Sequence, residues 1–194
     1  MVKYFALLVV IGTSYIAWLN IPEKHGPGIV VEHTPEVTST GWQKPFGFKN
    51  IDVIPEKKVK ARVRIISKKR YFFDEKKTYS PIDVYVGWQQ MSDEQNLKSI
   101  NITLTDRNYD IEISRPPIPV KKVYNQSNLW HLVPSNKEIR EKVTSIRTGN
   151  IIQVEGLLVS LKGENDFRWS TLKTIHAQPN ERGAILWIEK ISIE

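Results

Sequence analysis

The 194-residue chain has no cysteine, a net charge of +7 and 40% hydrophobic residues. This content is enough for a packed core, and the length suits one domain with appendages. Without cysteine the chain can form no disulfide, thiolate nucleophile or cysteine-ligated zinc site.

The positive charge is concentrated in one stretch. Residues 57–77 hold ten Lys or Arg against Asp74 and Glu75, a net charge of +8 that leaves −1 for the rest of the chain. Such a stripe attracts anionic lipid headgroups or nucleic acid, or it is the solvated face of an edge strand. We assign to this basic surface Lys60, Arg62, Arg64, Lys68 and Lys69.

Residues 4–19 form a run without charge. Counted over residues 2–21, it reaches the roughly 20 residues that a membrane-spanning helix needs. A cleaved signal peptide is the alternative, but cleavage after Ala17 would need a small residue where Tyr15 stands. We therefore expect residues 1–21 to be an uncleaved signal-anchor, a single transmembrane helix in a bacterial inner membrane, with the C-terminal domain in the periplasm.

Residues 22–56 are rich in Pro and Gly and keep no strand or helix period for long, so we expect a tether. Its aromatic stretch, residues 42–48, is expected to dock on the domain at its C-terminal end. His25 and His33 lie eight positions apart in this segment and are interpreted as incidental, not as metal ligands.

The globular domain, residues 57–194, is expected to consist mainly of β-strands. Apolar and polar residues alternate in several stretches, and a turn at residues 106–108 joins two of them into a hairpin. A capping box at Ser135 and Glu138 indicates a helix. We expect strands at 59–65, 80–88, 100–105, 109–113, 151–161, 167–172 and 184–193, and helices at 93–97 and near 136–146. This pattern predicts a mainly antiparallel α+β fold with two short helices, for which a small, partly open, OB-like barrel is one arrangement.

Short motifs follow one another in this domain: R-Y-x-x-D from Arg70, S-P-x-D from Ser80, G-W and M-S-D over residues 87–93, and H-x-x-P from His131. In order and spacing they resemble a family of uncharacterised bacterial membrane-anchored proteins. The resemblance covers residues 59–194. It implies a location at a membrane and a domain boundary, and it implies no mechanism. Leu129 stands where the family has Asn, and the chain lacks the family's Cys-Glu pair, which counts against an enzyme.

Asp83 is the strongest candidate for a functional side chain. If its strand is covered on both faces, the carboxylate is buried and needs a partner. The candidate partners are Arg70, Arg107 and His131, which with Asp74 would make a structural polar network. A hydrolase would instead use His131 and Asp83 as catalytic residues with Ser80 or Ser170, but neither serine lies in a nucleophile elbow.

No metal or cofactor is expected, because a site from His131, His176 and Asp83 lacks ligand spacing. Four tryptophans could stack bases, yet core packing explains them and a periplasmic position disfavours nucleic acid; they are Trp88, Trp130, Trp169 and Trp187. We therefore expect a non-enzymatic envelope protein whose domain binds a protein partner or the membrane surface. An OB-like nucleic-acid-binding module is the first alternative and the hydrolase is the second.

Overall fold

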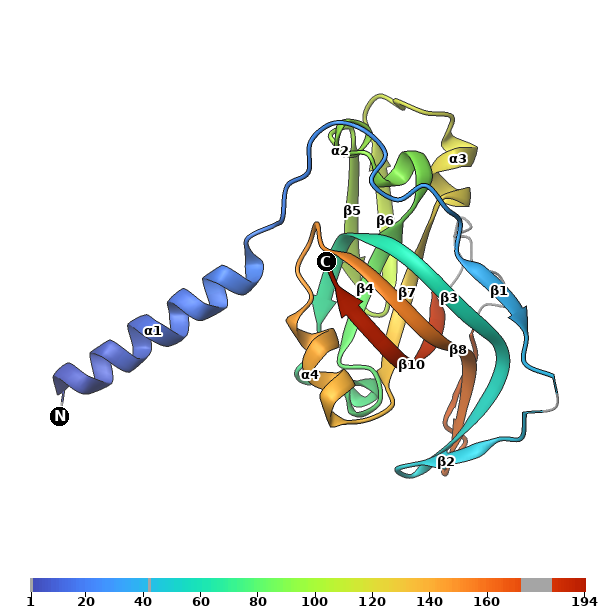
Figure 1. The fold of residues 1–194 in the computed structure, drawn as a ribbon. Coiled ribbons are helices and arrows are strands. Elements are labelled where there is room, and N and C mark those ends of the chain that lie inside the picture. Colours follow the sequence, from blue (N-terminus) through green and yellow to red (C-terminus); the bar gives the residue numbers. More distant parts are fainter. Residues whose placement is uncertain (1, 42, 172–182) are drawn as a thin grey trace.

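The computed structural model describes residues 2–41, 43–171 and 183–194, which form one β-rich domain with a projecting N-terminal helix (Figure 1). Among these residues one sheet has eight strands and a second sheet has two. The large sheet contains β1 (Glu36–Ser39), β2 (Phe46–Phe48), β3 (Ile51–Arg70), β4 (Ile82–Gly87), β7 (Ser127–Pro134), β8 (Ile151–Gly163), β9 (Arg168–Trp169) and β10 (Ala184–Ile193); the small sheet is the hairpin of β5 (Ile100–Thr105) and β6 (Asn108–Ile113). The helices are α1 (Val2–Asn20), α2 (Glu94–Leu97), α3 (Val120–Asn125) and α4 (Lys137–Ser145), with 3-10 turns η1 (Glu75–Thr78) and η2 (Gln89–Ser92).

Strand β3 closes the large sheet on itself. Its C-terminal part pairs with β4, and residues 51–64 pair with β8, both antiparallel. The path from β3 through β4, β7, β10 and β8 therefore returns to β3 and forms a ring of strands.

The sheet is mixed, which corrects the expected mainly antiparallel, OB-like barrel. Strand β10 runs parallel to β7 and antiparallel to β8. The alternation of side chains is the same in parallel and antiparallel strands, so it predicts which face a residue occupies but not the direction of the neighbouring strand.

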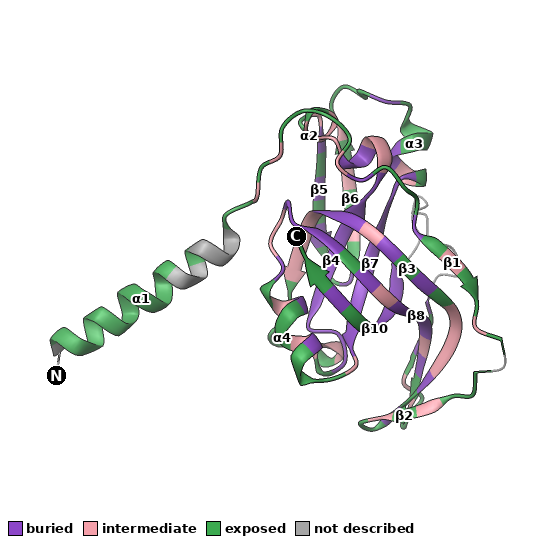
Figure 2. Cartoon of the chain, viewed as in Figure 1, coloured by how far each residue is buried: buried purple, intermediate pink, exposed green. Residues whose placement is uncertain are grey.

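Both faces of the central strands are covered (Figure 2). Alternate residues of the five ring strands form one core cluster, which includes Trp130, Val84 and Leu186 and is joined by two side chains of α4. On the opposite face, the β5–β6 hairpin and α3 cover Tyr85 and Leu129. As a result, all six residues of β4 and all eight of β7 are buried.

No helix in the described part of the chain is long and apolar enough to cross a membrane. The expected transmembrane signal-anchor at residues 1–21 is therefore corrected, and so is the single-pass inner-membrane and periplasmic location derived from it.

The segment that follows α1 lies against the domain. The amide of Glu23 donates to the carbonyl of Thr148 at 2.8 Å. Gly149 has φ +91, and a Cβ there would lie 1.9 Å from the carbonyl oxygen of Glu23, so only glycine permits this approach.

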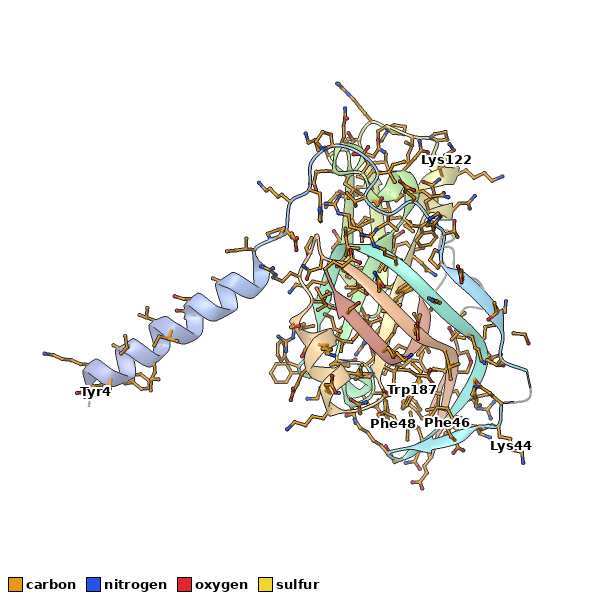
Figure 3. All side chains as sticks on the ribbon, in the orientation of Figure 1. Tyr4, Lys44, Phe46, Phe48, Lys122 and Trp187 are labelled. Atoms are coloured by element: carbon orange, nitrogen blue, oxygen red, sulfur yellow. The ribbon has the colours of Figure 1, made fainter. Side chains whose placement is uncertain are left out.

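Further along, the hairpin of β2 and β3 packs on β10. The rings of Phe46 and Phe48 meet Trp187 edge-on, with centroids 5.2 and 4.7 Å away (Figure 3). These three rings belong to a second core cluster that closes this end of the sheet.

Candidate functional site

The β5–β6 hairpin places Arg107 over the outer face of β4. Asp106 and Arg107 form the turn and both have positive φ, the geometry of a tight two-residue hairpin turn. Nε of Arg107 donates to Asp74 Oδ2 at 2.7 Å, and one terminal nitrogen donates to Asp83 Oδ1 at 2.7 Å. The other terminal nitrogen donates to the carbonyl of Ser80 at 2.8 Å and also contacts Asp74. One guanidinium thus bridges two carboxylates and ties the hairpin to the sheet.

His131 completes this cluster from the neighbouring strand. Because Asp83 and His131 are opposite each other in the β4–β7 ladder, their side chains point to the same face, and Nδ1 of His131 lies 2.8 Å from Asp83 Oδ1. The imidazole packs on Trp169 with ring centroids 4.8 Å apart. A Cβ on Gly183 would lie 2.9 Å from Nε2, so the Gly183 backbone covers the other ring nitrogen.

The cluster is enclosed. Asp83 is 0% exposed and His131 is 1% exposed. Burial and the nearby Asp83 charge raise the pKa of the Tyr71 phenol, whose oxygen accepts the Arg107 amide at 3.1 Å. A buried carboxylate is stable only when it is paired, and here the pairing joins three separate segments. The contacts are those of a structural polar network.

The hydrolase alternative has Nδ1 of His131 at 2.8 Å from Asp83 Oδ1, but within the described part of the chain Nδ1 forms no hydrogen bond there, and the Ser80 hydroxyl bonds other groups than the imidazole. The hydroxyl of Ser80 donates to the carbonyl of Ile82 at 3.2 Å and accepts from Arg107 at 3.2 Å. Ser170 is exposed, and His176 lies outside the described residues. Over the residues that the structure describes, no group of three or more His, Asp or Glu side chains could hold a metal ion.

Arg70 is the one member of the expected network that the structure does not place in the cluster. Its side chain is exposed, and its guanidinium carbon lies 5.6 Å from the centroid of the Phe72 ring. Arg70, the last residue of β3, therefore belongs to the surface at the end of this strand and not to the buried cluster.

Three of the five residues expected to form a basic surface along β3 contact carboxylates, Lys60, Arg62 and Arg64. Nζ of Lys69 instead lies 5.6 Å from the centroid of the Tyr71 ring, and Lys68 is half-buried. Lys60 lies 3.9 Å from Glu155, and Arg62 contacts Glu194 at 2.5 Å. Arg64 is buried, contacts Glu94 and donates to the carbonyl of Ser92 at 2.9 Å. A groove of about 490 Å³ beside these strands is lined by such paired charges, among them Lys60, Glu155 and Lys190.

At the C-terminal end of β3 and just after it, the basic side chains lie beside aromatic rings. We call Arg70, Phe72, Phe73, Lys77 and Arg140 the aromatic–basic surface. Phe72 is 62% exposed and Phe73 is 97% exposed. Arg70 lies beside Phe72, Nζ of Lys77 lies 5.8 Å from the Phe73 ring centroid, and Arg140 donates to the carbonyl of Lys77 at 3.4 Å.

Part of this surface is concave. A hollow of about 330 Å³ lies between the Arg70–Phe72 segment and α4. Its walls are partly flat and apolar, from Phe72 and Pro81, and partly cationic, from Arg70 and Arg140. Glu141 also borders the hollow and lies 3.9 Å from Lys137.

Cations crowd one another around this surface. Burial and the charge of Arg140 lower the pKa of Lys49. Burial and the charges of Arg70 and Arg147 likewise lower the pKa of Lys68. Like charges disfavour the protonated form of each lysine, so an anion bound here would relieve the repulsion.

A signal for this surface lies in the sequence, outside the candidate catalytic motifs. Two consecutive phenylalanines stand between basic residues, outside any alternating stretch. The four tryptophans considered as a stacking platform are buried instead: Trp88, Trp130, Trp169 and Trp187. Comparison with protein-family models, curated proteins and solved structures gave no match.

Proposed function

We propose that this chain is a non-enzymatic binding domain for an anionic macromolecule, which it holds at the aromatic–basic surface. The observation that carries the proposal is the contrast between the cations in the middle of β3 and those of the aromatic–basic surface. Lys60, Arg62 and Arg64 face carboxylates. Over the residues that the structure describes, the contacts given for Arg70, Lys77 and Arg140 are to aromatic rings and carbonyls and not to carboxylates.

A fixed cluster of cations favours a polyanion over a single small anion. Each cation that meets an anionic group releases counterions, so affinity grows with the number of contacts and falls with salt. The neighbouring cations support the same conclusion, because an anionic chain would lie across several of them at once: Arg140 acts on Lys49, and Arg70 and Arg147 act on Lys68, where they add to the larger effect of burial in lowering the pKa.

The test measures binding of the full chain to long-chain polyphosphate, which has charge but no rings, between 50 and 300 mM salt. We expect the double variant Arg70→Gln/Arg140→Gln to weaken binding about tenfold at low salt and to flatten the logarithmic salt dependence by one to two units, about one for each lost contact.

Arg62→Gln is the matched control, because Arg62 already pairs with Glu194, and it should change the affinity less than about twofold, as surface pairs contribute little. The proposal is wrong if the parent chain shows no salt-dependent binding, or if Arg62→Gln weakens it as much as the double variant does.

A further inference from the structure

We infer that the anionic macromolecule is a single-stranded nucleic acid, whose bases stack on Phe72 and Phe73 while its phosphates meet Arg70, Lys77 and Arg140. This inference rests on the proposed function and names its ligand. The evidence for it is the pair of exposed rings, because an anionic ligand without flat groups of its own would not stack on them.

The two phenylalanines are placed as stacking faces. They are adjacent in the chain and strongly exposed, and each has its own cation, Arg70 beside Phe72 and Lys77 beside Phe73. A single strand repeats a flat base and a phosphate at every nucleotide. Proteins that bind single strands combine aromatic platforms with a basic track in the same way.

The hollow beside Phe72 is the second observation that favours a single-stranded nucleic acid. Its volume of about 330 Å³ is at the lower end of the range for small-molecule pockets, about 300–1,000 Å³. One wall is apolar and another carries Arg140, so it offers a base a flat contact and a phosphate a charge.

Duplexes fit this surface less well than single strands. The bases of a duplex are stacked inside it, and reaching them requires unpairing. An acidic peptide would satisfy the cations but has no repeated ring for Phe72 and Phe73. Nucleic acid was expected to be unlikely because core packing explains the four tryptophans and because of a periplasmic location. The location depended on a membrane-spanning helix, which the described residues do not contain.

The experiment compares four probes by fluorescence anisotropy or sedimentation with the full chain: a labelled single-stranded 12-mer of mixed sequence, in DNA and RNA form; its duplex; long-chain polyphosphate; and vesicles of phosphatidylserine and phosphatidylcholine. Phe72→Leu and Phe73→Leu remove one ring each from an exposed position. Phe5→Leu is the matched control, because Phe5 is 71% exposed on α1.

We expect the single strand to bind at least about tenfold more tightly than the duplex at equal salt. Phe72→Leu and Phe73→Leu should each weaken single-strand binding about fivefold or more, in keeping with the effect of losing one stacked base. Polyphosphate binding should stay unchanged in both variants, and Phe5→Leu should alter neither.

Equal binding of duplex and single strand, or Phe variants that bind the single strand as the parent does, would overturn the inference while salt-dependent polyphosphate binding keeps the proposed function. Phenylalanine-dependent binding to vesicles without binding to the single strand would overturn it in favour of a lipid surface. Loss of binding to every polyanion would refute the proposed function itself.

Discussion

Replacing Arg107 should destabilise the domain more than replacing any exposed cation. Its guanidinium is buried and holds Asp74 and Asp83 through charged hydrogen bonds, two of them at 2.7 Å. Arg107→Met keeps an unbranched side chain of similar length but removes the charge. Asp83 would then remain buried with His131 as its contact.

The expected loss follows from the burial of the pair. Removing one partner of a buried ion pair costs about 3–5 kcal/mol, because the other charge stays buried without compensation. That is a large part of the 5–15 kcal/mol by which domains are ordinarily stable. In the Arg107→Met background, Asp83→Asn should restore about 1–2 kcal/mol, because an amide leaves no uncompensated charge.

Urea denaturation followed by tryptophan fluorescence measures these differences. Arg115→Met is the control, since Arg115 is exposed, and it should change the free energy of unfolding by less than about 0.5 kcal/mol. If Arg107→Met cost less than about 1 kcal/mol, or if adding Asp83→Asn made the chain less stable still, the cluster would not hold the hairpin on the sheet as we argue.

Two further predictions concern the N-terminal segment and α2. Gly149→Ala should cost about 2 kcal/mol and expose residues 21–35 to limited proteolysis, because its Cβ collides with Glu23; an unchanged digestion pattern would contradict this. Burial acts to raise the pKa of Glu94, but the hydrogen bond and charge of Arg64 outweigh it and lower that pKa. This stabilisation is complete above the ordinary pKa of glutamate and is lost as pH falls through the lowered folded value. Thermal melts from pH 6 to 3 should therefore show a smaller loss for Glu94→Gln than for the parent, and equal losses would count against the pair.

Local patterns in the sequence predict several elements. Alternation over residues 100–105 and 109–113, with turn residues between them, predicts the hairpin that the structure shows as β5 and β6. The apolar spacing after residue 136 predicts α4, although its cap is Asn136, which accepts from the amide of Ile139 at 3.0 Å, and not Ser135. These features depend on neighbours in the chain, so a local pattern can predict them.

The features that the sequence leaves open depend on distant partners. The alternation in β4 cannot tell whether Asp83 faces water, because the β5–β6 hairpin that covers it is a separate sheet. The parallel direction of β10 is set by its pairing with β7, and α3, which is not among the expected helices, forms directly after Pro119. Phe72 and Phe73 look like core residues by composition; their place between basic residues indicates a surface, and their exposure shows it.

The double pairing of β3 has a consequence for how the chain is made. Arg64 pairs with Ile151 in the ladder between β3 and β8, a separation of 87 residues. At about 5–20 residues per second, translation delivers that partner roughly 4–17 s after β3 has emerged. During this interval one edge of β3 is unpaired. Lysines on an unpaired edge disfavour its pairing with strands of other chains. Lys57, Lys58 and Lys60 occupy this part of β3, so charges that are partly neutralised in the finished ring protect the nascent strand until the ring can close.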